Sequence, residues 1–168
     1  APRTVTSQSH DLNGPAGERS RIERCLFDHG SDDGIDLQST SVDIRDNIFR
    51  FIADKVMSLE GDGPVGHPTI TGNLILDSGT GIALKSGVIV EEAHHNTVVA
   101  CQEGINLWAK AGAADGGHGV FHSLVVWSNI YNVKFDSKSD VAFTYSDVGG
   151  GAWPGAGNIS ADPRFADV

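Results

Sequence analysis

The chain has 168 residues, of which 39% are hydrophobic, enough to bury one core but not two. Lys and Arg total 12 against 22 Asp and Glu, so the formal net charge is −10. A negative protein repels nucleic-acid phosphates and anionic lipids, and no stretch approaches the roughly 20 apolar residues that cross a bilayer. We therefore expect neither nucleic acid as a partner nor insertion into a membrane.

Residues 1–17 are polar and contain several Gly and Pro, which predicts an arm or a cap. The start Ala1-Pro2-Arg3 is typical of a mature secreted protein and equally of a trimmed end. Cys25 and Cys101 are the two cysteines, too few for a disulfide framework. Because they lie about three repeats apart, we expect two buried free thiols.

From residue 18 onward, a short hydrophobic-x-hydrophobic segment recurs, introduced by a polar residue or a glycine. Its first hydrophobic residues are spaced by 21, 26, 23 and 28 positions and are Ile35, Val56, Ile82, Ile105 and Val133. Nine residues before the central three stand Asn47, Asn73 and Asn96. A third set precedes the segment by 12 or 13 residues and comprises Ile22, Ile44, Ile70 and Val120. Each repeat therefore predicts about three short strands.

Short strands in a repeat of this kind favour a solenoid, in which each turn of the chain stacks on the preceding turn. The sequence predicts an all-β fold, a right-handed parallel β-helix (solenoid) of about six coils over residues 18–148, followed by a closing loop over residues 149–168. Equivalent residues of adjacent coils then lie about 4.8 Å apart. Asn47, Asn73 and Asn96 are expected to form a hydrogen-bonded ladder along the axis.

Residues 32–47 and 73–84 resemble coils of bacterial right-handed parallel β-helix domains, and residues 145–165 resemble the segment that often closes such domains. This pectate-lyase-like group includes polysaccharide lyases and pectin-degrading hydrolases. The resemblance implies a secreted bacterial protein whose partner is a polysaccharide or a cell-surface glycan. The Arg-Ile-Lys segment of the hydrolases is absent, which weakens the hydrolase interpretation.

Acidic residues gather where the predicted strands begin. Two positions before the repeating hydrophobic residue stand Asp33, Asp54 and Glu103, and Asp32 and Asp36 flank the first of them. Carboxylates on adjacent coils lie about 5 Å apart, close enough to share a cation. The candidate metal ligands are Asp32, Asp33, Asp54 and Glu103, with calcium as the cofactor. The alternative is a solvated acidic edge that keeps the protein soluble.

Lyases of this fold use a Lys or Arg to remove the proton next to a uronate carboxylate, while a cation acidifies that carbon. Lys55 and Lys85 are the candidate catalytic bases, and an exposed turn lysine is the competing interpretation for Lys85. The candidate substrate-binding residues are Trp108, Tyr131 and Asp36, because aromatic rings stack on sugar faces.

The histidines match no metal motif. His94 and His95 are adjacent, whereas His118 and His122 have helical ligand spacing within a segment that we expect to be a strand. The sequence therefore predicts no histidine metal site.

Three hypotheses for the function follow, each from a different class. The first is an extracellular carbohydrate- or surface-binding module of a larger secreted protein. The second is a calcium-dependent polysaccharide lyase, or a related carbohydrate-active enzyme, acting on a uronate-containing polymer. The third is a structural subunit that associates end to end into a filament, because the open ends of a β-helix expose unpaired strand edges.

Overall fold

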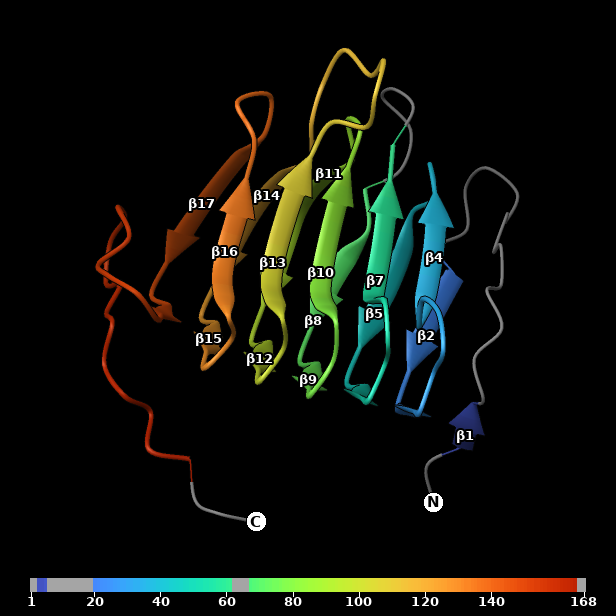
Figure 1. Ribbon diagram of the computed structural model, residues 1–168, viewed down its shortest axis with the longest axis horizontal. Helices are drawn as coiled ribbons and strands as arrows, with labels where there is room; N and C mark the ends of the chain where they lie inside the picture. Colours follow the sequence, from blue (N-terminus) through green and yellow to red (C-terminus); the bar gives the residue numbers. More distant parts are fainter. Residues whose placement is uncertain (1–2, 6–19, 62–66, 166–168) are drawn as a thin grey trace.

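The computed structural model describes residues 3–5, 20–61 and 67–165, which form a parallel β-solenoid of about five turns (Figure 1). Each complete turn contributes one strand to each of three sheets, and neighbouring turns pair in parallel. The predicted fold class is confirmed. The number of turns is about five rather than about six, because the last turn contributes strands to only two of the sheets.

The sheets are numbered in the order in which the chain enters them within each turn, starting from β2. Sheet 1 contains β2 (Ser20–Glu23), β5 (Val42–Arg45), β8 (Thr69–Thr71), β11 (Ile89–His94), β14 (His118–His122) and β17 (Asp140–Thr144). Sheet 2 contains β1 (Arg3–Val5), β3 (Cys25–Asp28), β6 (Ile48–Arg50), β9 (Leu74–Leu76), β12 (Thr97–Val99), β15 (Val125–Trp127) and β18 (Asp147–Val148). Sheet 3 contains β4 (Ile35–Gln38), β7 (Lys55–Glu60), β10 (Thr80–Lys85), β13 (Glu103–Trp108) and β16 (Tyr131–Phe135). Within the described ranges, no helix is long and apolar enough to span a membrane.

The core is built from columns of like side chains, because alternate residues of each strand point inward. In sheet 2, Phe27 and Phe49 stack with ring centroids 4.5 Å apart. In sheet 1, Phe121 and Phe143 stack at 5.4 Å. These side chains are almost fully buried, so the hydrophobic effect holds successive turns in one register.

Two positions differ from the alignment inferred from the sequence. Met57, not Val56, pairs with Ile82, because the second turn holds one residue more than the next turn before it enters sheet 3. Phe121, not Val120, continues the inward column of sheet 1, and Val120 is 50% exposed. Both errors arise where two hydrophobic residues are adjacent, since the pattern alone does not show which of them points inward.

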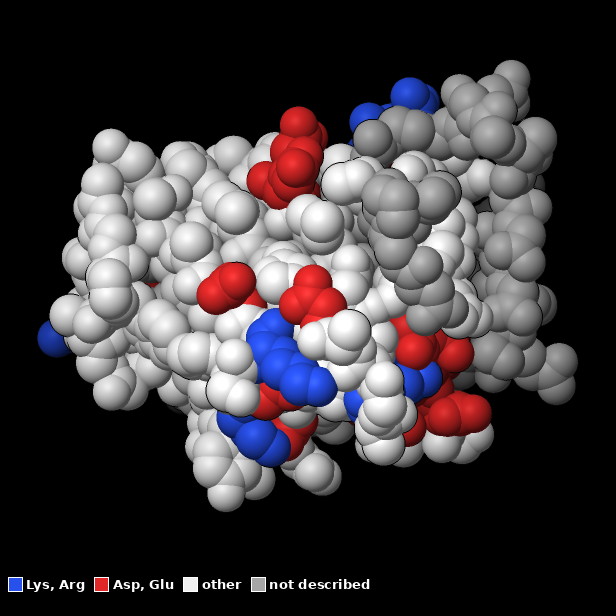
Figure 2. Space-filling model, turned by 90° about the horizontal axis from the view of Figure 1, so that it is seen from above, with Lys and Arg blue, Asp and Glu red and all other residues white. Residues whose placement is uncertain are grey.

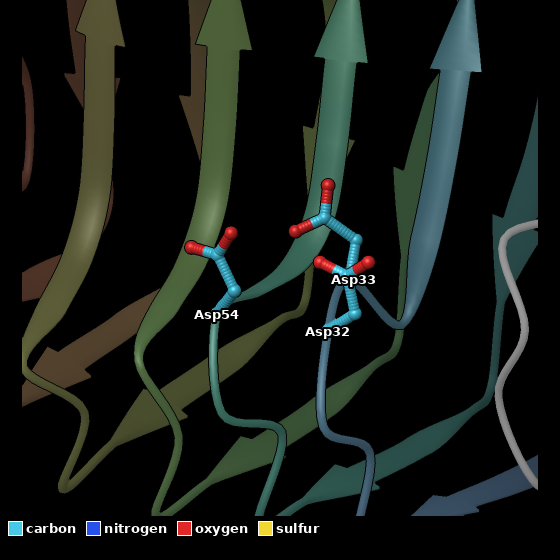
Figure 3. A group of neighbouring side chains, drawn as sticks. All are labelled: Asp32, Asp33 and Asp54. Atoms are coloured by element: carbon cyan, nitrogen blue, oxygen red, sulfur yellow. The ribbon is translucent and has the colours of Figure 1, made fainter.

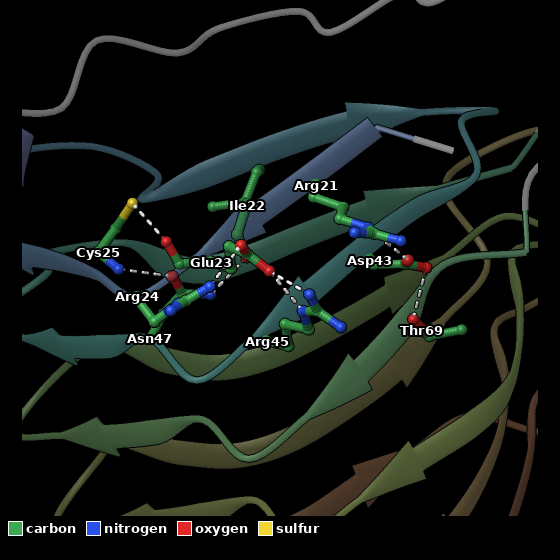
Figure 4. A network of polar contacts seen from close by, with 9 residues as sticks. All are labelled: Arg21, Ile22, Glu23, Arg24, Cys25, Asp43, Arg45, Asn47 and Thr69. Carbon is green, nitrogen blue, oxygen red and sulfur yellow. Dashed lines mark hydrogen bonds and ion pairs between the residues drawn. The ribbon is translucent and has the colours of Figure 1, made fainter. Parts of the chain in front are cut away.

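The predicted Asn ladder is confirmed, and it lies at the corner between sheets 1 and 2. Nδ2 of Asn47 donates to Oδ1 of Asn73 at 3.0 Å, and Nδ2 of Asn73 donates to Oδ1 of Asn96 at 3.0 Å. The backbone N–H of Cys25 donates to Oδ1 of Asn47 at 3.0 Å (Figure 4). The ladder therefore supplies hydrogen-bond partners to polar groups that are buried from water.

In each turn, the residue that directly follows the strand of sheet 1 has a positive φ. These residues have φ between 50° and 65° and are Arg24, Asp46, Gly72, His95, Ser123 and Tyr145. A left-handed residue turns the chain sharply, so that only one or two residues separate each strand of sheet 1 from the following strand of sheet 2. The left-handed conformation is costly for residues other than glycine, and the hydrogen bonds of the neighbouring ladder hold it in place.

The C-terminal segment packs against the last turn. The Trp153 ring lies 5.0 Å from the ring of Phe143 and 6.2 Å from that of Phe135. Nδ2 of Asn158 donates to the Phe143 carbonyl oxygen at 2.8 Å. Of the predicted N-terminal arm, Arg3–Val5 forms β1 beside β3, and residues 1–2 and 6–17 lie outside the described residues.

The two cysteines are free, as the sequence predicts, but their burial differs. Cys101 is 2% exposed, whereas Cys25 is half-buried. Burial raises the pKa of the Cys101 thiol to about 11, so this group stays protonated at neutral pH and is a poor nucleophile.

Candidate functional site

The structure places all of the site residues predicted from the sequence along sheet 3. They lie on its strands or immediately before them and are Asp32, Asp33, Asp36, Asp54, Lys55, Lys85, Glu103, Trp108 and Tyr131. Lys and Arg side chains lie beside Asp and Glu side chains along the lower edge of the view in Figure 2. Positive and negative side chains are therefore mixed on this part of the surface.

Three aspartates form the acidic cluster at the start of sheet 3. Asp32 and Asp33 precede β4, and Asp54 precedes β7 in the next turn (Figure 3). One carboxylate oxygen from each lies within 4.8 Å of the others, a spacing at which oxygen ligands could hold a cation. Asp33 is buried, whereas Asp32 and Asp54 are exposed.

Lys55 provides a positive charge within this cluster. Its Nζ lies 3.0 Å from Oδ1 of Asp33 and 2.5 Å from Oδ2 of Asp54. Burial opposes the charge of Lys55, but hydrogen bonds to Asp54 and Asp33 outweigh burial and raise the lysine pKa above its ordinary value. Lys55 is therefore held protonated, which does not suit it to act as a general base.

Glu103, the fourth predicted metal ligand, lies apart from the aspartates on β13, two strands along sheet 3 from β7. It forms an ion pair with Lys134 and accepts a hydrogen bond from Nδ2 of Asn106 at 2.6 Å. Burial would raise the pKa of Glu103, but the hydrogen bonds from Lys134 and Asn106 outweigh it and lower the pKa. Of the four predicted metal ligands, Asp32, Asp33 and Asp54 therefore lie together, whereas Glu103 lies apart and pairs with Lys134.

Lys85 is buried, not exposed at a turn. Its residue exposure is 4%, and its Nζ donates to Oγ of Ser58 at 2.7 Å. Oε2 of Glu60 lies 3.8 Å from Nζ and also pairs with Lys110, which reaches back from the segment after β13. Burial lowers the pKa of Lys85, the direction that a lysine general base requires.

The predicted substrate-binding residues lie at different positions on sheet 3. Asp36 is on β4, in register with Ser58, and Trp108 ends β13, in register with Lys85. Tyr131 begins β16 and is 56% exposed, with Nζ of Lys134 lying 5.2 Å from its ring centroid. Their separation along the sheet suits an extended ligand better than a compact one.

A groove at the corner between sheets 2 and 3 was not predicted from the sequence. Its volume is about 580 Å³, within the range of ligand sites, and its lining comprises Phe51, Ala53, Asp77, Ser78, Gly79, Ala100, Cys101, Gln102, Ser128 and Ile130. Small residues form its middle. A Cβ at Gly79 would lie 2.1 Å from the Asp54 carbonyl oxygen, so the close approach of two turns requires glycine there. Phe51 and Ile130 are 44% and 74% exposed.

A second polar network lies on sheet 1, near its N-terminal end (Figure 4). Glu23 pairs with Arg24 and Arg45, and Arg21 pairs with Asp43. Hydrogen bonds from Arg45 and then Arg24 lower the pKa of Glu23. These pairs satisfy one another across adjacent strands, so we assign them to the stability of the sheet rather than to a ligand.

The groove and the adjoining strand starts of sheet 3 are continuous. In each of four turns, a residue that lines the groove directly precedes a residue at the start of sheet 3. These pairs are Ala53 and Asp54, Gly79 and Thr80, Gln102 and Glu103, and Ile130 and Tyr131. A ligand lying in the groove would therefore contact the first residues of several strands.

Comparisons with protein-family models, with curated proteins and with solved structures find no match for this chain.

Proposed function

We propose that this chain is an extracellular carbohydrate-binding module whose ligand lies in the groove between sheets 2 and 3. The observation that carries the proposal is the composition of the groove, which combines exposed hydrophobic side chains with polar groups in a cavity of about 580 Å³. We propose an extracellular localisation for the protein because its proposed ligands, structural polysaccharides and surface glycans, lie outside the cell.

The groove offers the two kinds of contact that a sugar ring requires. A pyranose presents an apolar face of C–H groups and an edge of hydroxyls, so aromatic rings stack on the face and polar groups bind the edge. Phe51 supplies an exposed ring, whereas Asp77, Gln102 and Ser128 supply acceptors and donors. Ile130 adds apolar surface in the fifth turn.

The adjoining strand starts extend the contact surface for a polymer. Thr80, Glu103 and Tyr131 are register partners on neighbouring strands, which places them about 4.8 Å apart from one turn to the next. A chain of sugars running parallel to the solenoid axis would meet a polar or aromatic group at each step. A polymeric ligand is therefore favoured over a single sugar.

A glycan array probed with the full chain, followed by calorimetric titration of the tightest-binding oligosaccharide, tests the proposal. We expect Phe51→Ala and Gln102→Ala each to weaken binding at least tenfold. Tyr145→Ala is the matched control, because Tyr145 is also exposed but lies at the corner between sheets 1 and 2. Absence of glycan binding at millimolar concentration, or a Phe51→Ala variant that binds as tightly as the wild type, would refute the proposal.

A second candidate function, a calcium-dependent polysaccharide lyase, is favoured by one observation, the lowered pKa of buried Lys85. In that scheme Lys85 takes the proton next to a uronate carboxylate, and Asp32, Asp33 and Asp54 hold the cation. The substrate would have to displace the Glu60–Lys110 pair that lies beside Lys85. Ultraviolet absorbance of unsaturated products, measured on uronate polymers with calcium and with a chelator, distinguishes this function, since a binding module yields no such signal.

A further inference from the structure

Three histidines lie in two adjacent turns at the corner between sheets 1 and 2, which is a different corner of the solenoid from that of the groove. His94 ends β11, His95 follows it, and His122 ends β14 in the next turn. His94 and His122 are register partners in adjacent strands, and the His95 backbone N–H donates to the His122 carbonyl oxygen at 3.2 Å. All three side chains are half-buried or exposed, so an ion in solution can reach them.

The backbone at His95 explains why two consecutive histidines face each other. Successive side chains of a regular strand point to opposite faces. His95 instead has φ of 57°, in the left-handed region, which turns its side chain back toward that of His94. Nδ1 of His94 consequently lies 2.9 Å from Nδ1 of His95.

This contact is a hydrogen bond between the two rings, and its nitrogen–nitrogen distance also fits a chelated metal ion once both Nδ1 atoms present a lone pair. Imidazole nitrogens bind first-row metals at about 2.0 Å, so two neighbouring nitrogens of a square-planar ion lie about 2.8 Å apart. Square-planar coordination by nitrogen is typical of Cu(II) and Ni(II), and Cu(II) is bound most strongly in the divalent series.

His122 can supply a third imidazole by rotating its side chain, because its ring now lies against Tyr145, with the two ring centroids 5.3 Å apart. Within the described residues, only the three aspartates already place three ligand atoms within 4.8 Å of one another. Its Nδ1 lies 2.7 Å from Oγ of Ser123, and with the hydrogen on Nδ1 the ring donates to that hydroxyl and presents the Nε2 lone pair. A hydrogen bond of this kind from the non-ligating nitrogen is common in histidine metal sites, where it fixes the tautomer and the ring orientation. The parallel pairing of β11 and β14 holds His122 about one strand spacing from His94.

We propose that His94, His95 and His122 form a binding site for a divalent transition-metal ion, preferentially Cu(II), with water completing the coordination. Imidazole favours Cu(II) and Ni(II), whereas the carboxylates of Asp32, Asp33 and Asp54 favour hard ions such as calcium. The two sites therefore differ in ligand chemistry as well as in position.

Titration of the full chain with Cu(II) in excess calcium tests the proposal, because calcium occupies carboxylate sites without competing for imidazole. We expect one Cu(II) per chain, and nitrogen hyperfine structure in its electron paramagnetic resonance spectrum. His95→Asn, which retains a residue tolerant of positive φ, and His122→Gln should each weaken Cu(II) binding at least tenfold. His29→Gln is the control and should bind like the wild type, because His29 precedes sheet 3 and pairs with Asp28.

The same titration repeated at about pH 5 should show much weaker binding, since imidazole must lose its proton to bind a metal. Thermal unfolding of each variant without metal checks that the fold is retained. The proposal is overturned if His95→Asn and His122→Gln bind Cu(II) as tightly as the wild type, or if the spectrum shows oxygen ligands alone.

Discussion

Oδ1 of Asn73 accepts two hydrogen bonds from Asn47, one from the backbone N–H at 3.1 Å and one from Nδ2 at 3.0 Å. The Asn73 amide in turn donates to the Ile44 carbonyl oxygen at 2.9 Å and to Oδ1 of Asn96. One side chain thus serves polar groups of the turns before and after its own. Because these groups are buried, they have no access to water as a substitute.

Asn73→Ala should lower the free energy of unfolding by about 3–5 kcal/mol, since it leaves several buried donors and acceptors without partners. Urea unfolding followed by circular dichroism measures the change. Asn106→Ala is the control, because Asn106 lies on the outer face of sheet 3 and bonds to Glu103. The control should lose about 1 kcal/mol or less, and equal losses in the two variants would contradict a special role for the ladder.

The sequence was sufficient for the fold because a solenoid repeats its inward-facing positions at near-constant spacing. The hydrophobic columns and the Asn column are independent patterns, and both required the same stacking of turns. The alignment failed by one residue at Val56 and at Val120, where an adjacent hydrophobic residue, Met57 or Phe121, takes the inward position. Such a shift depends on how many residues a corner uses, which no hydrophobic pattern records.

The candidate site was predicted only in part. Stacking of turns was enough to bring Asp33 and Asp54 together and to place the candidate residues along one sheet. Lys85 is buried beside Glu60, which pairs with Lys110, a contact between side chains 50 residues apart in sequence that no repeat predicts. The groove depends on small residues at turns, and the arrangement of the histidines depends on the positive φ of His95. Neither feature produces a repeating pattern in the sequence.

Lys55→Met should make the protein dependent on a divalent cation. The substitution removes the ammonium that pairs with Asp33 and Asp54 and leaves three carboxylates close together. We expect a loss of about 1–3 kcal/mol in unfolding free energy, recovered in part by millimolar calcium. Thermal unfolding with calcium and with a chelator measures the effect. Calcium should shift the wild type less, and an equal shift in both proteins would show that Lys55 does not compete with the ion.

Lys85→Met should alter the pH dependence of stability while changing stability at neutral pH little. The lowered pKa means that folded Lys85 gives up its proton at a lower pH than the unfolded chain, whose lysines titrate near the ordinary value of 10.5. The wild type therefore gains stability as the pH rises from the folded pKa toward 10.5, and the variant lacks this gain. At about pH 7 we expect a difference of about 1 kcal/mol or less, since relief from burying a charge offsets the lost bond to Ser58.

Urea unfolding of the wild type and of Lys85→Met at intervals from about pH 7 to about pH 10 gives the comparison. Lys134→Met is the control, because Lys134 lies in the same sheet and its side chain is 43% exposed. The difference between the wild type and Lys85→Met should grow in favour of the wild type as the pH rises. A constant difference over this range would mean that burial does not depress the ionisation of Lys85.

Trp153→Ala should expose the last turn and promote self-association. Trp153 packs against Phe143 and Phe135, and β16 and β17 are the end strands of their sheets. End-to-end stacking of two copies would require a strand to pair at those edges, where the Trp153 loop now lies. Removing the ring should cost about 2 kcal/mol, less than a fully buried Trp because Trp153 is half-buried.

Light scattering coupled to size-exclusion chromatography over a concentration series measures the association. The Trp153→Ala variant should form larger species with rising concentration, whereas Tyr145→Ala, which removes an exposed ring near the same end, should behave as the wild type does. If the wild type already forms filaments, the loop does not block stacking and the structural-subunit hypothesis gains support. If Trp153→Ala keeps the wild-type size and stability, the Trp153 ring is not what prevents copies from stacking at this end of the solenoid.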